Sequence, residues 1–342
     1  MPWNVKQLIV ASADTVIKQN LSVCSKDFKN LARNSKICFQ KLLLNIHTDR
    51  RTAYIHFYMD ANRYIQLRYV YNRNGHWYMN IQTGSNTFKK DVYFINAVVD
   101  QFMKIFQIWR KASLGELKVN FEDCFMQVER YNGMKDEIVN RIRNILLSLN
   151  RPVSVTKFDF HVNGTQDDFM KILPYLEVGT LKEIWLCAIR RSLYLVGYTA
   201  IDMSMVAETD QWKHAEKLLL TYYMTLPYEK WNHFPDIIFV TTHLAMSLVT
   251  TIFQKFLHDP KADQCRMQFN ELDYRSCFEY FFRFNPKITE IHDVLILDFD
   301  LPNEHGNLFQ IRSMKGTMNF YKVTPQWRNE GPVELNTAQV LW

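Results

Sequence analysis

The sequence predicts an α/β protein, α+β overall, in which an N-terminal helical segment precedes an antiparallel β-meander and a body of stacked βα units. Hydrophobic residues make up 47% of the 342 positions and charged residues 22%, which is the balance of a folded globular chain. Apolar residues recur every three to four positions near the N-terminus, every second position over 53–81, and in alternating strand and helix patterns from residue 115 onward. The predicted divisions of the chain are 1–40, 41–150, 151–324 and 325–342.

The N-terminal segment has the pattern of two amphipathic helices, over 2–12 and 16–32. Their apolar stripes consist of Val5, Leu8 and Ile9 in the first helix and of Leu21, Cys24, Phe28 and Leu31 in the second. Two helices of this length cannot bury both stripes against each other. The stripes therefore face either the rest of the chain, as an ordinary cap on the meander, or a second polypeptide.

The next part of the chain alternates apolar and polar residues, as half-buried strands do. Strands are predicted over 41–47, 53–59, 64–70 and 76–81. Asn74-Gly75 is a hairpin turn signal between the last two of them, so we expect an antiparallel meander. An amphipathic helix follows, with a stripe made of Ile95, Val98, Phe102, Ile105 and Trp109.

From residue 115 the pattern becomes that of an irregular βα repeat. Strand starts are predicted near 157, 182, 216, 236, 265 and 294. Helices are predicted over 136–149, 165–176, 246–259 and 273–284. Units of this kind bury their apolar faces only by stacking on a neighbour, as in a leucine-rich-repeat-like body. The residues from Pro325 onward lack periodicity and are expected to fray.

The spacing of potential ligand residues along the sequence gives no sign of a metal, phosphate or cofactor site. The six cysteines form no CxxC pair, the ten histidines form no HExxH or paired-ligand spacing, and no glycine-rich phosphate loop occurs. We therefore predict no catalytic, cofactor-binding or metal-binding residues. Cys24 is expected to be a structural or interface thiol, because Lys26 lies two positions away on another face of the helix.

Two pairs of aspartates are candidates for acid–base or metal chemistry. Asp298 and Asp300 lie two residues apart on a predicted strand and therefore point to the same side, as acid or metal chemistry requires. A solvated strand face is the favoured interpretation, because no third ligand follows from the sequence. Asp167 and Asp168 begin a predicted helix, where helix capping explains their negative charge. Trp212, Trp231 and Phe234 are expected in the core of the repeat.

The formal net charge of +6 is modest, but the predicted meander interleaves basic and aromatic residues, as single-stranded RNA binding would require. The basic ones are Arg50, Arg51, Arg63, Arg68, Arg73, Lys89 and Lys90. The aromatic ones are Tyr54, Tyr58, Tyr64, Tyr69, Tyr71, Trp77 and Tyr78. The alternative places the aromatics on one packed face and the arginines on the other. No membrane span or secretory signal is predicted, so a cytoplasmic or nuclear protein is expected.

Longer stretches resemble two known families. The stretch MPWNVKQLIV…LSVCSKDFKNLA, over residues 1–32, resembles an F-box. Three further stretches resemble the FTH domain, the F-box-associated domain that is expanded in roundworms. They are FDFHVNGTQDDFMKILPYLEVGTLKEIWL (158–186), DQWKHAEKLLL (210–220) and WNHFPDIIFVTTHLAMSLVTTIFQKFL (231–257).

The resemblance implies a non-catalytic substrate-receptor subunit of a Skp/cullin/F-box ubiquitin ligase, acting in protein degradation. Its implied partners are a Skp-family linker, a cullin bound through that linker, and an unidentified protein target. The implied linker contacts are Pro2, Val5, Leu8, Ile9, Leu21, Val23, Cys24, Phe28 and Leu31. The alternative is a protein- or RNA-binding module of the same fold with no ligase role.

Overall fold

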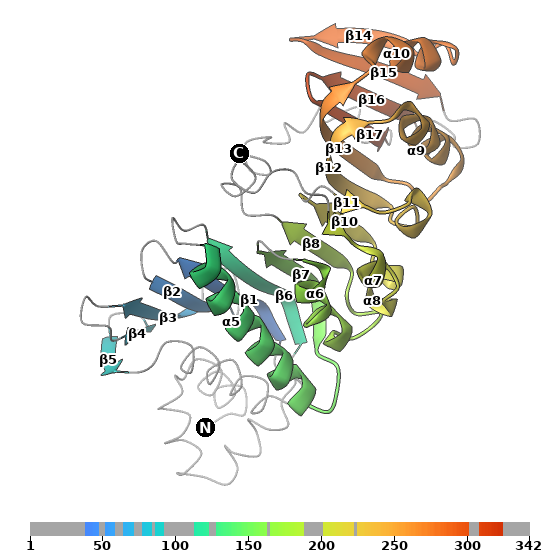
Figure 1. Ribbon diagram of the computed structural model, residues 1–342. Coiled ribbons are helices and arrows are strands. Elements are labelled where there is room, and N and C mark those ends of the chain that lie inside the picture. Colours follow the sequence, from blue (N-terminus) through green and yellow to red (C-terminus); the bar gives the residue numbers. More distant parts are fainter. Residues whose placement is uncertain are drawn as a thin grey trace, which may run out of the picture. The chain divides into compact units, whose positions relative to one another are not determined.

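The computed structural model describes the chain as two compact units, Met1–Ala215 and Glu216–Trp342 (Figure 1). The described residues are 38–47, 52–58, 64–71, 77–83, 86–91, 113–122, 128–162, 165–187, 201–221, 224–300 and 308–323. The two helices predicted over 2–12 and 16–32, the helix that carries the Ile95–Trp109 stripe and the tail 325–342 lie outside this set. Among the described residues, no helix is both long and apolar enough to cross a membrane.

The first unit contains the predicted antiparallel meander, with one strand more than the sequence indicated. Its strands are β1 (Cys38–His47), β2 (Thr52–Tyr58), β3 (Tyr64–Tyr71), β4 (Trp77–Thr83) and β5 (Asn86–Asp91). They pair in chain order. Ala53 and Ile55 are buried while Tyr54 and His56 are half-buried, so the alternation of side chains along β2 is confirmed.

Three parallel strands continue this sheet: β6 (Ser113–Glu122), β7 (Ser154–His161) and β8 (Glu183–Cys187). The first strand of the meander, β1, runs parallel to β6. The meander and the first βα units therefore share one sheet, although the sequence suggests two successive parts. A short strand, β9 (Ile201–Asp202), follows in this unit.

The helix α5 (Val128–Ser148) lies across one face of this sheet (Figure 1). The apolar stripe expected on this helix consists of Ile138, Ile142, Ile145 and Leu149. The three isoleucines are buried, whereas Leu149 lies just beyond the end of the helix and is only half-buried. The helix predicted over 165–176 is instead α6 (Gln166–Met170) followed by the 3-10 turn η1 (Leu173–Tyr175). Pro174 explains the break, because it has no amide hydrogen to continue the α-helical ladder. The unit ends with α7 (Ser204–Ala207) and α8 (Asp210–His214).

The second unit begins as the predicted repeat, with three parallel strands: β10 (Lys217–Leu220), β12 (Asp236–Leu244) and β13 (Gln264–Leu272). The helix α9 (Met246–His258) connects the last two, and α10 (Tyr274–Phe282) follows β13. The single strand predicted over 215–224 is divided into β10 and β11 (Met224–Thr225), and the 3-10 turn η3 (Tyr228–Lys230) precedes β12.

A strand begins at Val294 as predicted, but it does not continue the βα repeat, which ends at β13. The last strands are β14 (Lys287–Ile291), β15 (Val294–Asp300), β16 (Leu308–Met314) and β17 (Thr317–Val323). They form an antiparallel meander attached to β13 through β17. Tight turns explain the reversal, because two residues cannot make a parallel crossover. His292 and Asp293, with φ values of 48° and 65°, form the turn between β14 and β15.

Phenylalanine rings form the core between α9, α10 and the strands of the second unit. The ring of Phe253 lies 5.2 Å from Phe299 and 5.5 Å from Phe309, measured between centroids, and the Phe256 and Phe309 rings stack at 5.3 Å. Elsewhere, Trp212, Trp231 and Phe234 are at most 3% exposed, so their predicted place in the core is confirmed.

Candidate functional site

A row of charged and polar side chains lies on one face of the β6–β7–β8 sheet. Strand register sets Lys118 beside Asp159, and His161 between Asn120 and Cys187. The intervening residues on β6 and β7 are apolar and fully buried on the opposite face. We call Lys118, Asp159, His161 and Cys187 the polar cluster.

Asp159 is the centre of the polar cluster, with a side chain that is only 1% exposed. The Nζ atom of Lys118 donates a hydrogen bond of 2.8 Å to its Oδ2 atom. The Nε2 atom of His161 lies 2.6 Å from its Oδ1 atom. Burial alone would raise the pKa of Asp159, but interactions with His161 and the positive charge of Lys118 outweigh burial and hold this pKa well below its usual range. Asp159 is therefore a buried carboxylate held between the Lys118 ammonium and the His161 imidazole.

Cys187 completes the polar cluster at the end of β8, where its side chain is buried and not part of a disulfide. One potential ligand atom from each of Asp159, His161 and Cys187 lies within 4.8 Å of the others. The spacing of ligands along the sequence gives no sign of this grouping, because Cys187 is far from Asp159 and His161 in the chain. The alternation in KFDFHV, residues 157–162, already placed Asp159 and His161 on one side of a strand. Only the register of β7 with β8 adds Cys187.

Cations and aromatic rings flank the polar cluster on the same sheet. The Nζ atom of Lys157 lies 3.1 Å from the ring centroid of Trp185. On the meander, the Arg68 guanidinium lies 5.7 Å from the ring centroid of Tyr54, and the rings of His56 and Tyr58 are stacked. Arg68 and Tyr54 therefore share a face and are not segregated. Arg50, Arg51, Arg63 and Arg73 lie outside the described residues.

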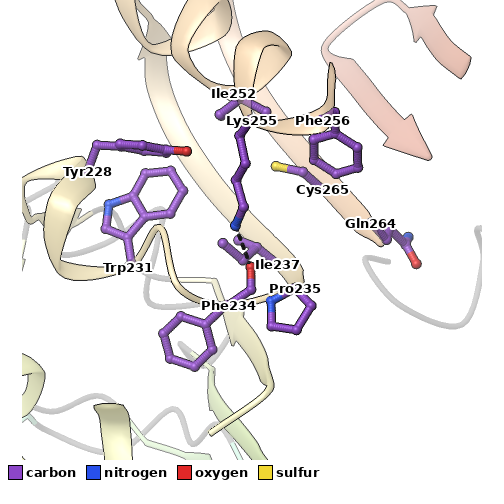
Figure 2. Close-up of a pocket in the computed structure, with 10 residues that line it drawn as sticks. All are labelled: Tyr228, Trp231, Phe234, Pro235, Ile237, Ile252, Lys255, Phe256, Gln264 and Cys265. Atoms are coloured by element: carbon purple, nitrogen blue, oxygen red, sulfur yellow. Dashed lines mark hydrogen bonds between the residues drawn. The ribbon is translucent and has the colours of Figure 1, made fainter. Parts of the chain in front are cut away.

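A small pocket in the second unit is lined by aromatic residues around Lys255 (Figure 2). Its volume of about 10 Å³ is that of a single water molecule. Lys255 donates through Nζ to the backbone oxygens of Asn232 and, at 2.7 Å, Phe234. Burial raises the pKa of the Cys265 thiol to about 12 and lowers the pKa of Lys255. The ammonium therefore ties α9 to the loop before β12, and the thiol beside it stays protonated.

The two aspartate pairs have different surroundings. Asp298 accepts a 2.7 Å hydrogen bond from the Gln310 side chain, and Asp300 is exposed at the end of β15. Asp167 is exposed, but the Asp168 side chain is only 3% exposed and bonds Lys135 at 2.8 Å. Helix capping therefore explains Asp167 and only part of Asp168. The predicted linker contacts between Pro2 and Leu31 lie outside the described residues.

One family model matches part of the chain. Residues 136–284, from within α5 to just beyond α10, match the family model of the FTH domain. This range includes the three stretches that carried the FTH resemblance and excludes the stretch that resembles an F-box. No curated protein and no solved structure matches the chain.

Proposed function

Because the chain carries an FTH domain over residues 136–284, a domain associated with F-boxes and protein interaction, we propose that it is a substrate receptor of a Skp/cullin/F-box ubiquitin ligase. In this role the N-terminal helices dock on a Skp-family linker and the α/β body holds a protein target. The match to the FTH domain is the observation that carries the proposal.

The composition of the N-terminal stripes supports docking. Each apolar side chain buried at an interface supplies roughly 1.5–3 kcal/mol before the costs of association are subtracted. Leu21, Phe28 and the other stripe residues together suffice for a specific interface of ordinary size. The receptor then acts by proximity, because it raises the effective concentration of the target near a ubiquitin-transferring enzyme.

The sheet of the first unit supports target recognition. Its polar face combines half-exposed aromatic rings, Trp185 and Tyr54, with the cations Lys157 and Arg68 placed over them. Aromatic and arginine side chains are the groups that contribute most to binding at protein interfaces. We propose this face as the surface that receives the target.

The docking proposal predicts that the double variant Leu21→Asp, Phe28→Asp loses the linker. Two apolar side chains of the proposed linker contact are replaced by charges, so the affinity for the linker should fall by more than about 100-fold. The measurement is retention of the full chain by an immobilised Skp-family linker. Leu147→Asp, at a position 46% exposed on α5, should be retained like wild type. A folded wild-type chain that fails to bind the linker would instead favour a binding module with no ligase role.

A second candidate function is binding of single-stranded RNA by the meander. The observation that favours it is that the Arg68 guanidinium lies over the Tyr54 ring, on the same face as the stacked pair His56 and Tyr58. Tyr54→Ala is then expected to weaken binding by about 1–3 kcal/mol, the contribution of one stacked base. Fluorescence anisotropy with labelled oligouridylate measures this loss. Arg275→Ala, at an exposed position on α10, is the control, and equal affinities of wild type and Tyr54→Ala would exclude RNA at this face.

A further inference from the structure

We propose that Asp159, His161 and Cys187 form a binding site for a thiolate-preferring divalent cation of the Zn²⁺ class. The site lies within the first unit and does not depend on the ligase role.

The donor set points to this class of metal. A thiolate sulfur, an imidazole nitrogen and a carboxylate oxygen are the ligands that Zn²⁺ takes in proteins, whereas Mg²⁺ and Ca²⁺ prefer oxygen alone. Bonds of about 2.0–2.3 Å in a tetrahedron place ligand atoms roughly 3.5 Å apart. The three candidate atoms lie within 4.8 Å of one another, so small side-chain rotations bring them to coordinating distance.

The backbone holds the three ligands in place. Asp159 and His161 project from alternate positions of β7, and Cys187 is the register partner of His161 on β8. A hydrogen bond of 3.1 Å from the amide of Val162 to the carbonyl oxygen of Cys187 secures the strand ends. The side chains of Asp159 and His161 are 1% and 29% exposed, so a metal ion would be reached from solvent past the imidazole. Three protein ligands with one position open to solvent is an arrangement that zinc sites use.

Lys118 is the natural competitor of the metal ion. Its ammonium lies 2.8 Å from Asp159 Oδ2 and 3.2 Å from His161 Nε2, which is where a cation held by both residues would also lie. The Lys118 side chain is 20% exposed, so the ammonium can withdraw toward solvent when a metal ion binds. Metal binding therefore replaces the positive charge of the Lys118 ammonium with that of the metal ion. Removal of the Lys118 charge should strengthen metal binding, which a purely structural ion pair does not predict.

The test is titration of the full reduced chain with Co²⁺ as a spectroscopic probe, followed by displacement with Zn²⁺. We expect a thiolate-to-cobalt charge-transfer band in the wild-type chain. In Cys187→Ser the intensity of this band should fall by the contribution of one thiolate ligand. His161→Gln should weaken binding at this site by more than about tenfold. Lys118→Met should tighten it by about tenfold or more, because a unit charge only a few ångströms away no longer repels the ion.

Matched controls separate this site from other cysteines and histidines in the chain. His214→Gln, at an exposed position on α8, should leave the titration unchanged. Near-ultraviolet circular dichroism shows whether each variant folds. Lys118→Met decides the question even if Cys187→Ser misfolds, because its expected effect is a gain of affinity. Equal bands in wild type and a folded Cys187→Ser, or no tightening in Lys118→Met, would overturn the proposal.

Discussion

Replacement of Asp168 by alanine is expected to lower the free energy of unfolding by about 3–5 kcal/mol, because it leaves a buried ammonium without its main partner. Lys135 is 8% exposed and lies 2.8 Å from the Asp168 carboxylate. The same carboxylate accepts a hydrogen bond from the amide of Thr165 at the start of α6. Asp136 is half-exposed and lies 3.4 Å from Lys135, so it can partly balance the ammonium charge in the variant. The expected loss of stability is therefore near the lower end of this range.

Urea denaturation of the purified chain measures this effect, and a neighbour provides the control. Asp167→Ala removes an exposed carboxylate from the same helical turn and should change the stability by less than about 0.5 kcal/mol. The double variant Asp168→Leu, Lys135→Met should recover most of the loss, because an apolar pair of similar size needs no counter-charge. Equal effects of Asp167→Ala and Asp168→Ala would show that capping alone accounts for both residues.

Replacement of Trp212 by alanine is expected to destabilise the protein by about 3–5 kcal/mol. The Trp212 side chain is completely buried. The backbone amide of Trp212 donates a hydrogen bond of 3.3 Å to the hydroxyl of Thr209, the residue that caps the start of α8. Deletion of the indole ring leaves a large cavity, and the capped start of α8 keeps the surrounding backbone from collapsing into it. Because natural domains are stable by only about 5–15 kcal/mol, thermal and urea denaturation should both reveal the loss.

Trp185→Ala is the matched comparison, because it deletes the same ring from a half-exposed position. At this position the lost stability comes from the partial burial of the ring and from its contact with Lys157, whose Nζ atom lies 3.1 Å from the ring centroid. A contact of this kind contributes about 0.5–1 kcal/mol at an exposed site. A smaller effect than for Trp212→Ala is therefore expected. If Trp185→Ala is as destabilising as Trp212→Ala, the distinction between a core tryptophan and a surface tryptophan does not hold.

Local pattern predicted much of the fold correctly where one period dominated. The alternation over 53–59 placed Ala53 and Ile55 on one face of a strand and Tyr54 on the other, which the structure confirms, and Ile138 and Ile142 of α5 are buried as expected. The prediction from hydrophobic periodicity was wrong where a single residue or a tight turn decided the local structure. Pro174 ended a helix early, and the turn at His292-Asp293 made the last strands antiparallel.

The sequence by itself determined the order of most strands and helices and the resemblance to an FTH domain, because both depend on residues close together in the chain. Only the tertiary structure decided which distant residues meet. Lys118, Asp159 and Cys187 come from three strands, and parallel pairing through β7 brings them together on one face. The same is true of Lys135 and Asp168, which join two helices. Strand register and helix packing are set by burial of apolar side chains across the whole unit, so the spacing of the polar residues themselves carries no signal of their contact.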